Sequence, residues 1–264
     1  MPPTRRGPVP TPERDLPYVL ALRALPGLGD VAQVELLRTF GSAEAAWDAW
    51  PDGWPTGHGS AETRTRARAR AEVAMARAAA LGATVTDILQ PDYPDAFRIL
   101  HDPPAACFLL GDATLLRRPA VAVVGSRACT DLGAETARLL GAELARCGLV
   151  VLSGLARGID GAAHEGALAV GGATVAVLGS GLQVAYPAEH TELQRRIAER
   201  GCLVTEFLPD EGPRRHHFPR RNRLLAALAR GVVVVEAAAD SGALITVDHA
   251  LALGRPVMAF PGPA

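Results

Sequence analysis

Six arginines, two histidines and one phenylalanine lie among the twenty residues from 212 to 231, and none of these twenty residues is acidic. Arginine binds phosphate through pairs of N–H groups, and an aromatic ring can stack on a nucleic-acid base. This basic segment therefore has the chemistry of a nucleic-acid site. A solvated loop that leads into an amphipathic helix is the alternative interpretation of such a charge run, so its surroundings have to decide.

Small residues, some with an arginine beside them, follow apolar stretches elsewhere in the chain: Gly125-Ser126-Arg127, Gly154 to Gly161, Gly179-Ser180-Gly181 and, after Glu236, Ser241-Gly242. Small residues at helix N-termini leave backbone N–H groups open to an anion. We therefore expect Gly125 and Ser126 to hold a phosphate and Arg127 to close on it.

Several enzyme and cofactor classes lack their motifs here. The spacing G-x-x-x-G-x-x-G from 154 to 161 is not the dinucleotide fingerprint, and neither a Walker A motif nor GxSxG occurs. Asp160 and His164 are interpreted as a capping residue and a structural histidine. Glu206 and Glu236 end two strands, but no nucleophile or metal set accompanies them. We expect binding groups without a catalytic constellation, a metal or a cofactor.

The elements that must position these residues alternate between strand and helix after Thr84. Strands are predicted at 120–124, 150–153, 174–178, 203–205, 232–236 and 256–260, and helices at 131–147, 162–170, 190–200 and 241–253. Strands that are apolar throughout form a parallel sheet covered on both faces. The predicted fold is α/β, a Rossmann-like doubly wound sheet over 84–264, with 85–111 bracing one edge. Ligands bind beyond the carboxyl ends of such strands.

A small all-α domain is predicted before this sheet, at residues 16–82, after a disordered tail at 1–15. Its Pro26-Gly27-Leu28-Gly29 turn is typical of a helix-hairpin-helix or sterile-alpha-motif element, and whether it contacts DNA is left open. A loop is expected at 51–59 and a long helix at 61–81. The arginines at 64, 66, 68, 70 and 77 spread around that helix and are interpreted as a solvated face.

Overall charge, cysteine content and hydropathy limit which kinds of binding site and which protein classes are compatible with the sequence. The formal net charge of the 264 residues is −1, so a polyanion site must be a local concentration of charge. All 27 cationic residues are arginine, which weakens the significance of arginine at any one position. The four cysteines form no CxxC pair and are interpreted as buried, reduced thiols. No apolar stretch approaches the ~20 residues of a membrane span, so we expect a cytoplasmic protein without membrane contact.

A series of motifs runs in order through residues 84 to 262: Gly125-Ser126-Arg127, Ser153 to Asp160, His164 to Leu168, Tyr186-Pro187, Phe218 to Arg223, Val234 to Ala237, Ser241 to Thr246 and Pro261-Gly262. The series resembles the family of DNA-processing proteins called DprA or Smf. The N-terminal α unit is similar to the sterile-alpha-motif-like domain of many members.

The resemblance implies a non-enzymatic protein that binds single-stranded DNA, forms a homodimer and loads the RecA recombinase in natural transformation. It implies that DNA runs over a pocket lined by Arg127, by Arg215 or Arg214, and by Phe218. For Arg221 to Arg223, DNA contact and a scaffold role are both open, while Arg220 and Arg230 are expected to be peripheral. The predicted DNA-binding residues are Gly125, Ser126, Arg127, Gly154, Arg157, Gly158, Arg214, Arg215, His217, Phe218, Arg221, Asn222, Arg223, Ser241 and Gly242.

Three departures from the family pattern affect this expectation. Gln183 and Ala188 stand where relatives have an aspartate and, in some, a DNA-contacting lysine, which predicts a weaker groove there. The sequence stops at Ala264, so the end of the Rossmann-like domain is expected to be incomplete. The alternative functions are a nucleotide-processing enzyme of the LOG phosphoribohydrolase type, whose PGGxGTxxE motif is missing, and a protein that contacts RecA without binding DNA.

Overall fold

The computed structural model of the protein describes residues 12–49, 60–239 and 241–261. The expected loop at 51–59 and most of the expected tail lie outside the described residues. Contacts divide the chain into two compact units, one formed by residues 1–76, 85–93 and 101–106 and the other by residues 77–84, 94–100 and 107–264.

The helices of the first unit pack around small and aromatic side chains. They are α1 (Pro12–Arg23), α2 (Asp30–Phe40), α3 (Ala43–Asp48) and most of α4 (Ala61–Ala80). Helix α1 begins at Pro12, so the prediction that disorder extends to residue 15 is wrong. The reason is tertiary: Asp15 is buried, and its carboxylate accepts hydrogen bonds from Ser42 Oγ and from Glu44 N, both at 3.0 Å.

Eight strands form one mostly parallel sheet in the order β1-β2-β6-β5-β4-β3-β7-β8. Strand β2 pairs antiparallel with β6, and the neighbouring pairs from β6 to β8 are parallel. This confirms the predicted Rossmann-like fold. The segment 85–111 supplies most of the two strands at one edge, as expected. The strands are β1 (Thr84–Asp87), β2 (Ala106–Gly111), β3 (Ala120–Val124), β4 (Val150–Ser153), β5 (Thr174–Val177), β6 (Cys202–Thr205), β7 (Gly231–Val234) and β8 (Val257–Ala259).

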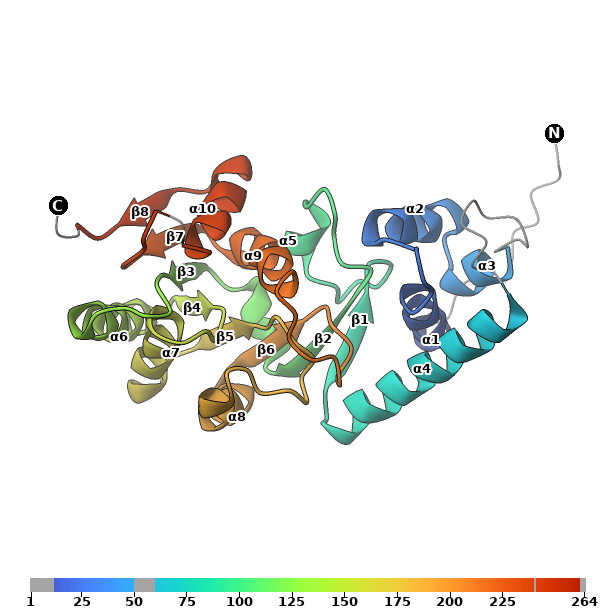
Figure 1. The fold of residues 1–264 in the computed structure, drawn as a ribbon, viewed down its shortest axis with the longest axis horizontal. Coiled ribbons are helices and arrows are strands. Elements are labelled where there is room, and N and C mark those ends of the chain that lie inside the picture. The colour runs from blue at the N-terminus through green and yellow to red at the C-terminus, as the bar shows by residue number, and fades with distance from the viewer. Residues whose placement is uncertain (1–11, 50–59, 240, 262–264) are drawn as a thin grey trace. The chain divides into compact units, whose positions relative to one another are not determined.

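Helices cover both faces of the sheet in the second unit (Figure 1). From β3 to β6 the chain winds in one direction, so right-handed crossovers place α6 (Asp131–Arg146), α7 (Ile159–Ala169) and α8 (Thr191–Arg200) on one face. From β6 it returns past β3, which places α9 (His217–Leu228) and α10 (Ala243–Ala252) on the other face. The winding therefore reverses between β3 and β7. Shorter helices are α5 (Asp95–Arg98), η1 (Ala113–Arg117) and η2 (Ala188–His190).

A core of small and branched side chains fixes α6 and α7 on the sheet. Val123, Val151 and Ile159 are fully buried there with alanines of both helices. The helices approach closely because Gly166 leaves room for a backbone: a Cβ at this position would lie 1.9 Å from Arg138 O. This packing sets the position of the loops that precede α6 and α7.

Candidate nucleic-acid interface

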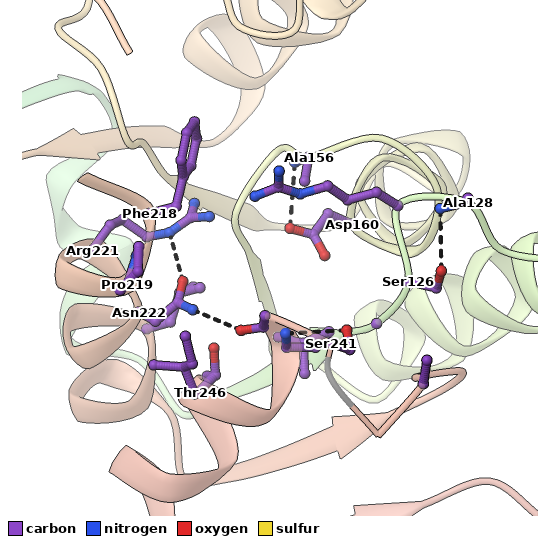
Figure 2. A pocket seen from close by; sticks show the side chains of 18 of the residues that line it. Ser126, Ala128, Ala156, Asp160, Phe218, Pro219, Arg221, Asn222, Ser241 and Thr246 are labelled. Atoms are coloured by element: carbon purple, nitrogen blue, oxygen red, sulfur yellow. Dashed lines mark hydrogen bonds between the residues drawn. The ribbon is translucent and has the colours of Figure 1, made fainter. Parts of the chain in front are cut away.

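A cleft of about 670 Å³ opens where the winding of the sheet reverses. It lies beyond the carboxyl ends of β3 and β7, which is where open α/β sheets bind ligands. Figure 2 shows side chains of β3–α6, β4–α7, α9 and α10 around it. The lining residues are Val124, Gly125, Ser126, Arg127, Ala128, Ala156, Asp160, Tyr186, Arg215, Phe218, Pro219, Arg221, Asn222, Leu225, Ala238, Ser241, Gly242, Ala243, Ile245 and Thr246.

A cation and two rings meet in this cleft. The Arg127 guanidinium carbon lies 4.9 Å from the centre of the Phe218 ring, which is within the range of a cation–π contact. The centre of the Tyr186 ring lies 5.4 Å from the centre of the Phe218 ring, and the two ring planes are tilted by 40°. Phe218 also lies over Gly179, where a Cβ would be 2.8 Å from Phe218 Cδ1. Arg127 is exposed, so its charge faces solvent beside the rings.

The segment Gly125-Ser126-Arg127 is held by its own backbone and by Glu236. Ser126 N donates to Glu236 O at 2.6 Å, and Ser126 O accepts from Ile159 N at 3.2 Å. Ser126 Oγ accepts from Ala128 N at 3.1 Å (Figure 2). The Ser126 N–H therefore already has a hydrogen-bond partner inside the protein, contrary to the prediction that it is open to a phosphate. The segment offers the Ser126 hydroxyl proton and the Arg127 guanidinium instead.

The loop from Gly154 to Gly158 is also fixed internally. Asp160 Oδ2 accepts from Gly154 N at 3.1 Å and from Ala156 N at 3.3 Å, so the predicted anion donor Gly154 N is occupied as well. Leu155 is fully buried with φ 59°, a backbone conformation found at functional sites when the surroundings enforce it. Gly158 has φ 69°, and a Cβ there would lie 2.3 Å from Ser126 O. Gly158 thus packs against the loop after β3 and lines neither the cleft nor the recess beside it.

Arg221 belongs to the scaffold of the cleft. It is 3% exposed, and its Nη1 donates to Gly154 O at 2.7 Å and also to Val177 O. Its Nε donates to Asn222 Oδ1, and Asn222 Nδ2 donates to Gly242 O, each at 3.1 Å (Figure 2). Burial lowers the pKa of Arg221 to about 10, although Asp160 opposes this shift. The network ties the loops after β4 and β7 to the end of β5.

Two further residues of the predicted set, His217 and Arg223, are buried on α9. Arg223 Nη2 lies 2.9 Å from Glu206 Oε2, and Arg220 Nη2 lies 2.7 Å from the same oxygen. His217 Nδ1 is hydrogen-bonded to Gly179 O at 3.2 Å, and its ring stacks on Phe207. Burial lowers the pKa of His217. Of the two roles left open for Arg221 to Arg223, DNA contact and scaffold, these contacts favour the scaffold role. His217 also supports the fold.

Asp160 and His164 are both buried and are used as internal hydrogen-bonding groups. His164 Nδ1 is hydrogen-bonded to Thr174 Oγ1 at 2.7 Å, and not to Asp160. Burial lowers the pKa of His164 to about 3 and raises the pKa of Asp160. Glu236 accepts from Thr130 N and from Thr130 Oγ1 and so fixes the start of α6. His164 is thus a structural residue, as interpreted, whereas Asp160 lies within α7 behind the N-cap Gly158 and fixes the preceding loop without capping the helix.

A second recess of about 310 Å³ adjoins the cleft and shares Arg127, Tyr186 and Phe218 with it. Gly154 and Arg157, which do not line the main cleft, line this recess. Arg157 is paired with Glu189, with Nε to Oε1 and Nη2 to Oε2 both at 2.7 Å. Among the predicted pair of arginines, Arg215 lines the cleft, while Arg214 is exposed and lines neither space.

Sequence reasoning missed part of the lining. Tyr186 was quoted as part of a motif but not assigned to the site, although an aromatic residue just after a glycine loop could have suggested a second stacking ring. Pro219, Ile245 and Thr246 lie within the motif series but were not assigned to the site, and the packing of α9 against α10 brings them to the cleft.

The cysteines depart from their prediction in part. All four are free thiols; Cys107 and Cys202 are buried, Cys129 is half-buried and Cys147 is exposed, so burial was wrongly predicted for Cys147. In the part of the chain that the structure describes, no cluster of three metal-binding side chains occurs. Among the same residues, no helix has the length and apolar content needed to cross a bilayer.

The mostly parallel, doubly wound sheet with a cleft where its winding reverses defines a Rossmann-like protein with a ligand-binding type of cleft. Residues 84–264 match the family model described as DNA recombination-mediator protein A, and the chain belongs to this family.

Several relatives are similar to most of this chain. The DNA processing protein DprA of Streptococcus pneumoniae is 46% identical over 175 residues, which is 66% of this chain and 62% of that protein. Protein Smf of Escherichia coli is 46% identical over 172 residues, 65% of this chain and 46% of that protein. The chain thus spans less than two thirds of these relatives.

Two solved structures are similar as well. The crystal structure of Streptococcus pneumoniae DprA is 34% identical with a TM-score of 0.78 and covers 94% of this chain and 87% of that one. The structure of DNA processing protein A from Helicobacter pylori, reported for its single-stranded DNA binding mode, is 32% identical with a TM-score of 0.62. It covers 69% of this chain and 81% of that one.

Proposed function

We propose that this protein binds single-stranded DNA in the cleft and acts as a recombination mediator that loads RecA onto incoming DNA in natural transformation. The observation that carries the proposal is the Arg127 guanidinium 4.9 Å from the Phe218 ring in an open cleft. A phosphate pairs with the guanidinium while the neighbouring base stacks on a ring. Family membership and the DNA-binding relative of Helicobacter pylori support this.

A single strand suits the cleft better than a duplex. Stacking on Phe218 or on Tyr186, which is 43% exposed, requires a base that is not already stacked in a double helix. Arg127 and Arg215 supply charge from two sides, from the loop after β3 and from the segment before α9. Non-specific binding of this kind is carried by phosphates and rings and does not read a base sequence.

The proposed function is binding without catalysis. The carboxylates at the ends of β6 and β7 are engaged in the scaffold, since Glu206 binds two arginines and Glu236 binds Thr130. A phosphoribohydrolase needs a carboxylate that faces its substrate, and this arrangement does not favour one. A homodimer and contact with RecA are part of the proposal on the strength of the family alone.

The test is a titration of oligo-dT at about 50 and 200 mM salt with the wild type and Arg127→Ala. Neutralising one phosphate contributes about 0.7 to the slope of log affinity against log salt for a single strand. We expect Arg127→Ala to bind more weakly and to lose about that much slope. Arg230→Ala is the matched control, because Arg230 belongs to the same basic segment but precedes β7, at the amino end of that strand, away from the cleft.

Two results would overturn the proposal. One is absent or salt-independent binding of oligo-dT by the wild type. The other is an equal effect of Arg127→Ala and Arg230→Ala, which would mean that charge anywhere on the protein matters as much as charge in the cleft.

A further inference from the structure

Arg157, one of the predicted DNA-binding arginines, is already paired with a carboxylate of the protein, that of Glu189. The Arg157–Glu189 pair is bidentate and side-on, with both N–O distances at 2.7 Å. The two side chains are 61% and 51% exposed, so the pair is accessible from solvent. The hydrogen bond to Glu189 raises the pKa of Arg157, and the same bond lowers the pKa of Glu189. Both groups are therefore charged at neutral pH.

The geometry of this pair is the geometry of phosphate binding. A guanidinium presents its Nε and Nη hydrogens as a fork that fits either a carboxylate or two oxygens of a phosphate. Glu189 fills both prongs of the Arg157 fork. A DNA phosphate at this position can therefore bind Arg157 only if it displaces the Glu189 carboxylate.

The pair lies where competition between Glu189 and a DNA phosphate for Arg157 would affect binding. Arg157 lines the recess that shares Arg127 and Phe218 with the cleft. Glu189 lies in η2, and η2 is fastened to the same loop by a second contact, since His190 Nδ1 lies 3.0 Å from Leu155 O. The carboxylate is thus held beside the recess and not merely carried on a free surface chain.

The geometry points to Glu189 as an intramolecular competitor of the DNA phosphate, which keeps Arg157 neutralised and sets the affinity of the recess side of the cleft. This inference rests on the proposed binding of single-stranded DNA. Phosphates are then directed to Arg127 and Arg215, which have no acidic partner among the described contacts. Glu189 acts on DNA through Arg157, so it is a positioning residue.

The test compares Glu189→Gln, Arg157→Ala and the double variant in the oligo-dT titration. Glu189→Gln frees Arg157 for one phosphate, so we expect about threefold tighter binding at low salt and a slope that grows by about 0.7. Arg157→Ala lowers affinity less than twofold when Glu189 is present, and it removes the whole gain in the Glu189→Gln background. Glu199→Gln is the matched control, because Glu199 also pairs with an arginine, Arg195, but lies at the far end of α8.

The outcomes separate the possible roles of the pair. If Glu189→Gln gains affinity and the double variant keeps the gain, Glu189 repels DNA without Arg157 and the inference is wrong. Reduced affinity in both single variants, together with a lower melting temperature, would mean that the pair is a loop brace. If the wild type binds and Arg127→Ala weakens binding while Glu189→Gln changes nothing, the proposed function stands and the competitor role fails. Loss of binding in every protein would instead refute the proposed function.

Discussion

Arginines that look alike in the sequence have different roles in the structure. Arg127 and Arg215 are exposed and line the cleft, whereas Arg221 and Arg223 are 3% and 2% exposed and are bound to carbonyls or to a carboxylate. Arg157 is exposed but already paired. A positive charge in the right segment is therefore not enough to assign a DNA contact, because burial and existing partners decide whether a phosphate can reach the guanidinium.

At the residue scale, the buried His164 makes the free energy of unfolding depend on pH. Its folded pKa of about 3 lies below the ordinary 6.5, so below about pH 6.5 the unfolded chain binds a proton that the folded protein does not. Stability contributed by His164 is present at neutral pH and is lost as the pH falls. Asp160, whose folded pKa is raised, acts in the opposite direction at lower pH.

We expect the unfolding free energy, measured with urea, to fall by about 2 kcal/mol more in the wild type than in His164→Gln between about pH 7 and pH 5. The comparison between variants removes the effect of Asp160, which is common to both. His101→Gln is the control, because His101 is exposed. The account of His164 is wrong if the two pH profiles of wild type and His164→Gln run parallel.

At the element scale, the cleft depends on two loops that meet at Gly158. Its φ of 69° disfavours any side chain, and a Cβ would also strike Ser126 O at 2.3 Å. Gly254, with φ 66°, has the same backbone strain but open space around it. A substitution at Gly254 therefore tests backbone strain alone, whereas the same substitution at Gly158 adds a steric clash with Ser126 O.

We expect Gly254→Ala to lower stability by about 1 kcal/mol through strain and to leave oligo-dT affinity within about twofold. Gly158→Ala is expected to lower stability further and to weaken oligo-dT binding by about tenfold, because it displaces the Ser126–Arg127 segment. Urea unfolding and the DNA titration measure both effects. Equal affinity in the two variants would show that the spacing of the two loops does not shape the site.

The elements themselves were largely predictable from the sequence. Strands β3 and β4 were predicted at their observed bounds, because each is an apolar run that ends at a glycine loop. Helix α9 begins at His217, so the basic segment leads into a helix, as one interpretation of its charge run expected. The antiparallel pairing of β2 with β6 depends on contacts between distant residues, so no local pattern announces it.

The site was predictable only in part. The family resemblance implied a pocket lined by Arg127, by Arg215 or Arg214, and by Phe218, and Arg127, Arg215 and Phe218 do line one cleft. Sequence reasoning assigned backbone N–H groups of Ser126 and Gly154 to an anion, but Glu236 O and Asp160 Oδ2 accept from them. Glu236 is distant from Ser126 in the sequence, and even the local pair of Gly154 and Asp160 forms only when the loop before α7 has folded.

At the scale of the whole molecule, DNA binding has to be local. The formal net charge is −1, so attraction to a polyanion comes from the arginines around the cleft and not from the protein as a whole. Helix α4 carries another group of arginines, yet Arg66 pairs with Glu62, and Arg64 and Arg68 lie over the rings of Trp47 and Tyr18. We therefore expect DNA to bind to the second unit.

The most direct measurement of this central claim is photo-crosslinking of oligo-dT that carries 5-iododeoxyuridine, followed by mass spectrometry of the crosslinked peptides. A base stacked in the cleft lies against Phe218 or Tyr186, so we predict crosslinks to peptides that contain these residues. The crosslinks should fall sharply in Arg127→Ala. Crosslinks confined to the region of Tyr18, Trp47 and α4, with none at Phe218 or Tyr186, would contradict the account.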